Sequence, residues 1–136
     1  MDLHTIVGTA IRSSLLANSA VTTLVDGRIY QVAAPARTPL PYVLFWWNGG
    51  GYINDSPKNP FNTIFIITGV ANNASTAQQI STAIANALVG QDPNFPSPYK
   101  SWSPVTIEEP FHDMSSVQNE QYWRFGSVYR FRGLKD

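Results

Sequence analysis

A short polar segment near the C-terminal end of the chain contains the residue types of a serine hydrolase. His112 and Asp113 are adjacent, and Ser115 and Ser116 follow them closely. A nucleophilic serine needs a base within hydrogen-bond reach and a third group that orients the base, and adjacency in sequence does not provide that geometry. We therefore interpret the segment as a polar turn between strands. A small hydrolase is a rival interpretation, and it requires a pocket in which His112 contacts a serine.

The residue types that bind metals are sparse and poorly spaced. The chain has two histidines, His4 and His112, and neither has a second histidine four positions away on a helix. Glu108 and Glu109 are a loose candidate for an acid-base pair, but neighbouring residues on a strand point to opposite faces. There is no cysteine, which excludes disulfides, thiol catalysis and thiolate metal sites. We expect no catalytic residue, no metal, no cofactor and no enzyme activity.

Three consecutive glycines, Gly49, Gly50 and Gly51, raise the question of a phosphate-binding loop. No Lys-Ser or Lys-Thr pair follows them, and Tyr52 does not open a recognisable helix. We interpret residues 48–60 as a long loop with a flexible tip. We expect this loop to be mobile in the free protein and to become ordered against a partner, with Tyr52, Ile53 and Phe61 as anchors.

Aromatic residues and arginines alternate near the C-terminus, a composition that open sheets use to bind single-stranded nucleic acid. Alternation along a strand places the two kinds of side chain on opposite faces. We expect the aromatic face to be buried, and the arginines to meet carboxylates of a neighbouring subunit. A sheet module that binds nucleic acid is the alternative. The aromatic set is Trp123, Phe125, Tyr129 and Phe131, and the opposite set is Arg124, Val128, Arg130 and Arg132.

Composition limits the remaining function classes. The 136 residues are enough for one domain, and 43% of them are hydrophobic, so we expect residues 1–136 to form a single domain with one core. Nine lysines and arginines balance nine aspartates and glutamates, so no strong overall field attracts nucleic acid or an acidic membrane. The longest apolar runs are far shorter than the roughly 20 residues of a membrane helix. We expect a product of the cytosol that makes no membrane contact.

Apolar periodicity predicts two main helices. Asp2 can cap a first helix that runs to about Ala17, and a short helical turn follows from Ser19 to Val25, where Asp26-Gly27 ends it. Ser75 and Gln78 have the spacing of a capping box, and an alanine-rich helix follows them and ends at Gly90. The predicted apolar stripe of the first helix is Leu3, Ile6, Val7, Ala10, Ile11 and Leu15, and that of the later helix is Ala77, Ile80, Ile84, Ala87 and Leu88.

The strand candidates are separated by segments rich in proline, glycine or polar residues. This order favours an α+β fold in which two helices pack on one face of a mainly antiparallel β-sheet. The predicted strands are 28–30, 42–47, 61–70, 105–109 and 121–132, and the predicted connections include a rim loop at 33–41, a proline-rich surface segment at 91–104 and a polar turn at 110–120.

Two short motifs resemble the start of phage tail terminator proteins, also called tail completion proteins. Leu24 to Tyr30 reads LVDGRIY, and a proline-containing loop leads from it to the run LPYV at residues 40–43. The resemblance extends from residue 3 to about residue 90. It implies a single tail-terminator-like domain that closes into a ring, usually a hexamer. The ring would lie on the last ring of the tail tube and present its other side to the head connector.

The sequence thus predicts a structural virion protein, made in the host cytoplasm, that forms a homo-oligomer and binds a tail tube protein and a head-tail connector protein. A different neck or tail adaptor, or the nucleic-acid-binding module, is the alternative, and we expect no specific nucleic acid. Large aromatics such as Trp46, Trp47, Phe95 and Trp102 suit assembly interfaces. The expected interface residues are Arg124, Arg130, Arg132, Gly49, Gly50, Gly51, Tyr52, Ile53 and Trp102.

Overall fold

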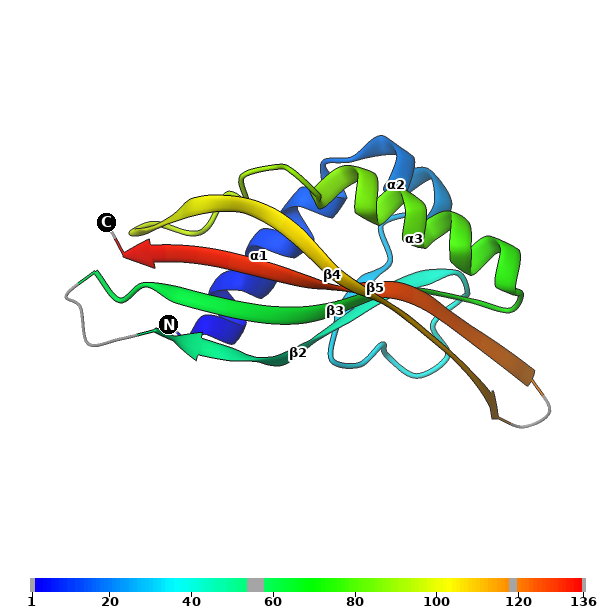
Figure 1. Cartoon of the computed structure of the whole chain (residues 1–136). Helices are drawn as coiled ribbons and strands as arrows, with labels where there is room; N and C mark the ends of the chain where they lie inside the picture. Colours follow the sequence, from blue (N-terminus) through cyan, green and yellow to red (C-terminus); the bar gives the residue numbers. More distant parts are fainter. Residues whose placement is uncertain (1, 54–57, 118–119, 136) are drawn as a thin grey trace.

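The chain folds into a five-stranded sheet with helices on one face (Figure 1). The computed structural model describes residues 2–53, 58–117 and 120–135, and the side chains of residues 115–117 and 120 fall outside that description. The strand order is β1-β2-β3-β5-β4. Strand β1 is parallel to β2, and the other neighbouring strands are antiparallel. The predicted α+β class with a mainly antiparallel sheet is therefore confirmed, with a third, short helix in addition to the two main ones.

The boundaries of the elements are as follows. The helices are α1 (Leu3–Leu16), α2 (Ser19–Val25) and α3 (Ala74–Leu88), and the strands are β1 (Ile29–Gln31), β2 (Tyr42–Tyr52), β3 (Phe61–Ala71), β4 (Tyr99–Val117) and β5 (Glu120–Lys135).

The first two helices begin and end at residues that suit helix termini. The Asp2 carboxylate accepts a hydrogen bond from the Thr5 backbone N–H at 2.8 Å, and that bond lowers the pKa of the Asp2 carboxyl. The Asn18 side chain caps α2 in the same way. Helix α2 ends at Asp26, with φ 53°, and Gly27 follows with φ 73°. Two successive left-handed residues stop the helix and turn the chain into β1.

Helix α3 lies close against the sheet because one strand residue has no side chain. A Cβ atom at Gly69 of β3 would lie 2.5 Å from Cβ of Ile80, so this glycine is required for the close approach. The cap of α3 differs from the prediction. The Asn73 side chain accepts the Thr76 N–H at 2.8 Å, so the cap lies two residues before the expected Ser75, since asparagine caps a helix as well as serine does.

The core lies between the sheet and the helices. Strand β3 is at the centre of the sheet, and its side chains are buried on both faces over Phe65 to Ala71. Burial of an aromatic or branched aliphatic side chain stabilises a fold by about 1.5–3 kcal/mol. The largest fully buried side chains come from every layer: Ile6, Ile11, Leu15, Ile29, Phe45, Phe61, Phe65, Ile67, Ile80, Ile84, Tyr129 and Phe131.

The glycine-rich first part of the predicted loop is strand. Strand β2 extends to Tyr52 and pairs with β3 up to Phe61, so Gly49, Gly50 and Gly51 belong to the sheet. The register shifts between Trp47 and Gly49, which marks a β-bulge. Glycine fits there because Gly49 has φ 146° and Gly50 has φ 83°. Of the rest of the predicted loop, residues 53 and 58–60 are outside any strand, and residues 54–57 lie outside the described residues.

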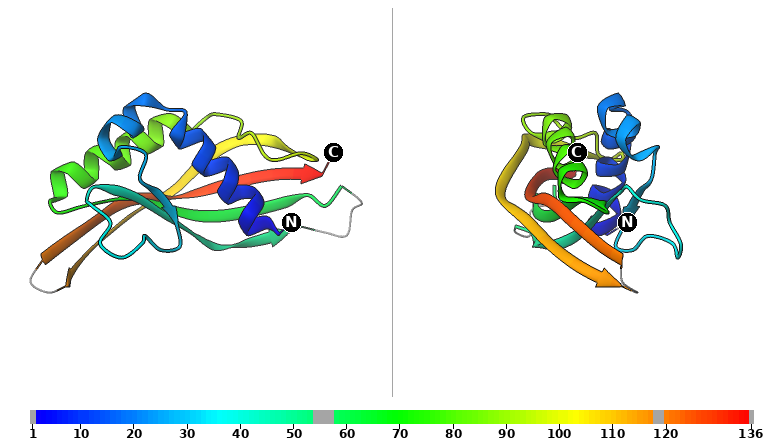
Figure 2. Two further views of the ribbon diagram at one scale, coloured as in Figure 1. Left: turned by 180° about the vertical axis from the view of Figure 1, so that it is seen from behind. Right: turned by 90° about the vertical axis from the view of Figure 1, so that its right-hand side faces the viewer.

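The last hairpin is much longer than the prediction. Strand β4 spans 19 residues, so the predicted proline-rich segment ends at residue 98 and most of the predicted polar turn at 110–120 is strand. Pro104 favoured a surface segment because proline is excluded from central strands, and the polar residues after Pro110 favoured a turn, whereas β4 lies at the edge of the sheet, where proline is tolerated. The far part of this hairpin, residues 111–117 with 120–125, starts beside α3, where Phe111, His112 and Phe125 line a cavity with α3 residues, and continues beyond the helices (Figures 1 and 2). We call it the hairpin arm.

Candidate interaction surfaces

The three arginines of β5 lie on the sheet face opposite the helices, as predicted, but they have partners within the chain. Arg124 Nε donates to Asp113 Oδ1 at 2.7 Å, and a second bond joins Arg124 Nη2 to the other carboxylate oxygen. The Arg124 guanidinium carbon also lies 5.7 Å from the centre of the Trp46 ring. The paired geometry fixes this guanidinium in place.

Arg130 and Arg132 are held in a similar way. Arg130 bonds to the Glu108 carboxylate and donates from Nη1 to Asn62 Oδ1 at 2.7 Å. Arg132 Nη1 donates to Thr106 Oγ1 at 3.3 Å. Side chains from β3 and β4 therefore occupy positions that we assigned to a neighbouring subunit. These guanidinium groups thus already have partners within one chain, and a subunit contact through them stays a prediction.

An aromatic pair closes part of the same face. Trp46 of β2 and Phe111 of β4 meet edge to face with ring centroids 5.6 Å apart. Their strands are three spacings apart in the sheet, or about 14 Å. The two side chains thus lean toward each other across β3 and β5. Beneath this face Ile66, at 6% exposure, and Val128, at 7%, are sheltered although no helix covers them.

The opposite end of the sheet exposes three predicted interface residues, and one further aromatic is exposed near the middle of β2. Tyr52 and Ile53 are half exposed at the end of β2, and Trp47 is equally exposed beside the bulge. Trp102 of β4 is also half exposed, and its indole Nε1 donates to the Gly133 carbonyl at 3.1 Å. The register brings Tyr52 level with Gly133 and Ser101, so Tyr52, Ile53 and Trp102 lie toward one end of the sheet, and Trp47 lies nearer its middle, level with Phe65 and Tyr129. Phe95 is buried and belongs to the core.

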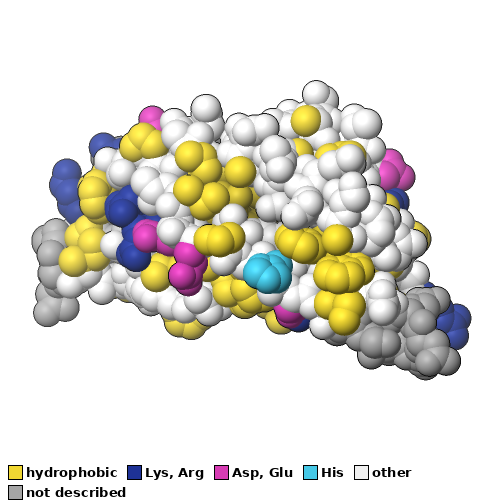
Figure 3. Space-filling model, turned by 45° about the vertical axis from the view of Figure 1, so that its right-hand side comes forward, with side chains coloured by type: hydrophobic (Ala, Val, Ile, Leu, Met, Phe, Trp, Pro, Cys, Tyr) yellow, Lys and Arg dark blue, Asp and Glu magenta, His cyan; other side chains and the backbone are white. Residues whose placement is uncertain are grey.

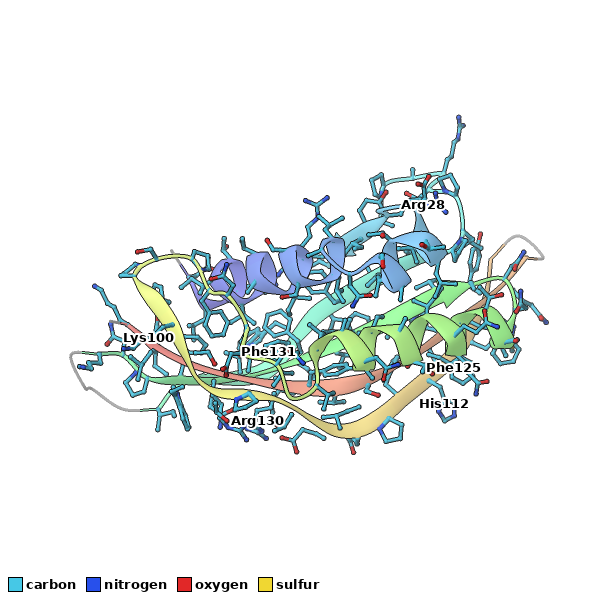
Figure 4. The ribbon with its side chains drawn as sticks, turned by 90° about the horizontal axis from the view of Figure 1, so that it is seen from above. Arg28, Lys100, His112, Phe125, Arg130 and Phe131 are labelled. Carbon is cyan, nitrogen blue, oxygen red and sulfur yellow. The ribbon has the colours of Figure 1, made fainter. Side chains whose placement is uncertain are left out.

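The predicted polar turn around His112 lies on the hairpin arm. The His112 ring stacks on Phe125 with a centroid distance of 5.7 Å, and Figure 4 shows the two side by side. Phe125 in turn stacks on Trp123 at 6.2 Å. Met114 is half exposed farther along the arm. In Figure 3 hydrophobic side chains gather beside the histidine of this face, next to the end of the hairpin. Sequence reasoning missed this surface because it assigned the segment to a turn.

An open cavity of about 530 Å³ lies between α3 and the β4–β5 pair, and His112, Ser81 and Ser127 are among the residues that line it. Within the described part of the chain, no hydrogen bond joins His112 to a serine, so the hydrolase geometry is not formed there. Ser115 and Ser116 have side chains outside the description. Among the described residues no three His, Asp or Glu side chains are grouped to hold a metal ion. The described helices include none that is long and apolar enough to cross a membrane.

The two motifs of the resemblance are joined directly. Arg28 Nε donates to the Pro41 carbonyl at 3.0 Å, and the Val43 N–H donates to the Arg28 carbonyl at 2.9 Å. Tyr30 and Tyr42 also meet edge to face at 5.9 Å. Together these contacts fix the parallel pair of β1 and β2. The motifs are therefore a structural connection that positions the edge of the sheet.

Tyr52 and Trp102 are exposed at one end of the sheet, Met114 is exposed on the hairpin arm, and the strand edges are long. These features suit a subunit that acts through contacts with other proteins. A family model described as Tail completion protein gp17 matches residues 9–101. The chain therefore belongs to this family and is a structural protein of phage tails.

The solved structures include a chain with the same fold in the virion of a native gene transfer agent particle. The two chains superpose with a TM-score of 0.70 at 20% sequence identity, and the match covers 96% of each. At that identity the similarity shows a shared fold, and this fold covers nearly the whole chain. Comparison with curated proteins gave no match.

Proposed function

We propose that copies of this chain form a ring that caps the phage tail tube and joins it to the head connector. Membership of the tail completion family carries the proposal. The architecture supports it, because large apolar side chains are exposed at both ends of one extended sheet, with Tyr52 and Trp102 at one end and Met114 on the hairpin arm. The chain that shares this fold belongs to a virion. A hexamer is the proposed copy number, and a tail tube protein and a head-tail connector protein are the proposed partners.

In this role the protein acts by contact and not by catalysis. It would be made in the host cytoplasm and incorporated into the virion at the junction of tail and head. The ion pairs of the sheet face suit this role, since Asp113 and Glu108 neutralise Arg124 and Arg130 within the chain. A face of paired charges contacts another protein at a lower desolvation cost than unpaired charges do.

Negative-stain imaging and light scattering of the purified protein, with and without purified tail tubes, test the proposal. We expect rings on one end of each tube, and we expect tubes without the protein to lack this cap. Labelled protein found at the head side of the connector, and absent from tube ends, would favour a different neck adaptor. No association with tubes or with itself at any concentration would refute the ring.

The alternative of a nucleic-acid-binding sheet receives less support from the structure. Binding to phosphates requires available cations, and the sheet-face arginines are already bonded to Asp113, Glu108, Asn62 and Thr106. The aromatic Trp46 is covered by Phe111 and Arg124. Binding of a single-stranded oligonucleotide that weakens steeply with salt would favour this alternative, whereas a neutral ring subunit predicts no such dependence.

The three arginines provide a direct test of the ring contact. Replacement of Arg124, Arg130 and Arg132 by alanine should impair ring formation while the monomer stays folded, with a lower melting temperature because intrachain bonds are also lost. Asp113→Asn is a matched control, since it weakens the Arg124 pair and keeps every arginine. If the triple variant assembles normally, the arginines take no part in the subunit contact.

A further inference from the structure

The two edges of the sheet are protected along most of their length but not throughout. On the β2 side, β1 pairs with Val43–Phe45, and the Val32 N–H bonds to the Phe45 carbonyl. Beyond that point, within the described residues, no strand pairs with the outer edge of β2 from Trp47 to Tyr52. The Ile53 N–H donates to the Pro60 carbonyl, toward the β3 side. Backbone groups of successive strand residues point to opposite sides of the strand, so the N–H and C=O of Tyr52 point outward, away from β3.

The β4 edge has an open stretch as well. Near its start, Val105 exchanges hydrogen bonds with Gly90 and Gln91, and Pro104, Pro110 and three register shifts disfavour further pairing. Among the described residues after Pro110, no proline, register shift or hydrogen bond of this kind protects the edge of β4. From Phe111 to Val117 the strand pairs with β5 in continuous register, and its other side meets no described strand. An edge left open in this way is a site for strand addition.

The two open stretches fit one another. They lie on opposite edges and at opposite ends of the sheet (Figure 1), and they are similar in length, six residues in β2 and seven in β4. Strand β2 contributes Gly49 and Gly51, and a Cβ atom at either position would meet nothing within 4 Å. Strand β4 contributes bulky side chains, including Phe111 and the half-exposed Met114. The stretch 47–52 carries no charge, and Asp113 is paired with Arg124, so no charges of like sign would meet.

We propose that residues 111–117 of one copy add as a strand to the edge of β2, at residues 47–52, in the next copy. The sheets of neighbouring subunits then join. Because the two stretches differ, the contact is head to tail, and in a closed ring every copy uses both of its open edges. A partner of another kind would cover one edge and leave the other open. The inference rests on the proposed ring and names the surfaces that would hold it together.

Cross-linking tests the contact, and the absence of native cysteine makes the experiment clean. Tyr52→Cys protein and Met114→Cys protein are mixed, allowed to assemble on tail tubes and treated with a bismaleimide of roughly 15 Å reach. Strand addition places the two positions within about 11 Å in any full overlap of the strands. We expect a cross-linked dimer in the mixture and much less in either variant alone. Rings that form without this cross-link refute the strand contact and leave the ring proposal intact, whereas failure to form rings refutes both.

Backbone substitution tests the hydrogen bonding. Tyr52→Pro removes an outward N–H and leaves the inward bond of Ile53 in place, and Tyr52→Ala removes the same side chain while keeping the N–H. We expect Tyr52→Pro to associate about tenfold more weakly than Tyr52→Ala, as the loss of one interface hydrogen bond predicts. Melting curves confirm that both variants are folded, and the cross-link remains informative if the proline variant is not. Equal association of two folded variants would overturn the proposal.

Discussion

Tyr129 carries a polar group in an apolar environment. It is fully buried, and its hydroxyl makes no hydrogen bond with the described residues. Burial raises the pKa of Tyr129 to about 12, and Ser127 nearby opposes the rise without reaching hydrogen-bond geometry. An unpaired buried hydroxyl lowers the free energy of unfolding, and packing of the Tyr129 ring in the core offsets this loss.

The variant Tyr129→Phe should therefore be as stable as the parent at pH 7, or more stable by up to about 1 kcal/mol. The parent should also lose stability as pH rises from 10 toward 12, because the unfolded tyrosine ionises near pH 10 and the folded one does not. At pH 11 this loss is about 1 kcal/mol for Tyr129 alone. Urea unfolding of both proteins at pH 7 and pH 11 measures it. A parent and variant with the same pH dependence would contradict the raised pKa.

Gly27 is the second residue with a specific backbone role. Its φ of 73° follows the left-handed Asp26, and a side chain there would meet little more than Leu16. The cost of a substitution therefore comes from the backbone. Gly27→Val should lower the free energy of unfolding by about 1–3 kcal/mol, and Gly27→Asn should lower it much less, because asparagine tolerates this conformation. Coincident thermal melts of parent and valine variant would show that the cap does not need glycine.

Within strand β2, neighbouring glycines that look alike in the sequence differ in whether the fold requires them. Gly50 has φ 83°, and a Cβ atom there would lie 2.1 Å from the Asn62 carbonyl oxygen. Gly51 has neither a positive φ nor a close neighbour. The fold of the single chain thus requires glycine at position 50 and does not require it at position 51.

Paired alanine variants test this distinction. Gly50→Ala should lower the free energy of unfolding by about 2–4 kcal/mol, since both the backbone and β3 oppose the new methyl group. Gly51→Ala should stay within about 1 kcal/mol of the parent, with any change toward higher stability, because alanine restricts the unfolded chain. Chemical denaturation of the two variants beside the parent gives both values. Equal losses would mean that the strand geometry at residue 51 is as constrained as at residue 50.

The whole molecule is asymmetric in how its sheet is covered. The helices bury one face, the Trp46–Phe111 pair and the arginine pairs partly close the other, and the hairpin arm extends past both layers (Figure 2). Stability should follow this arrangement, with β3 most protected because it lies between two strands and under the helices. The arm, with one open edge, should be the least protected part of the sheet.

Amide exchange of the free protein and of assembled tails should reveal the pattern. In the free protein we expect slow exchange in β3, fast exchange in 111–117, and alternation in β2, where Ile53 is protected and Tyr52 is not. Assembly should slow exchange at Tyr52 and along 111–117. Strong protection of both segments before assembly would mean that neither is a free edge, and unchanged exchange after assembly would mean that partners contact other surfaces.

The sequence by itself determined the elements whose signals are local. Asp2 and the apolar stripe specified α1, Asp26-Gly27 specified the end of α2, and the apolar run at 61–70 specified the central strand, because capping and periodicity act within a few residues. Alternation in β5 placed the arginines on the face opposite Tyr129 and Phe131. The LVDGRIY and LPYV motifs indicated the family.

Tertiary structure decided the edges of the sheet and the partners of its charges. Gly49–Gly51 and residues 110–117 resemble loops locally, and pairing with β3 and β5 makes them strands because a neighbouring strand supplies hydrogen bonds that no local rule counts. The carboxylates of Asp113 and Glu108 reach Arg124 and Arg130 through the register of that same hairpin. Whether an arginine faces a neighbour or its own chain depends on this long-range register, which the spacing of residues in one strand does not contain.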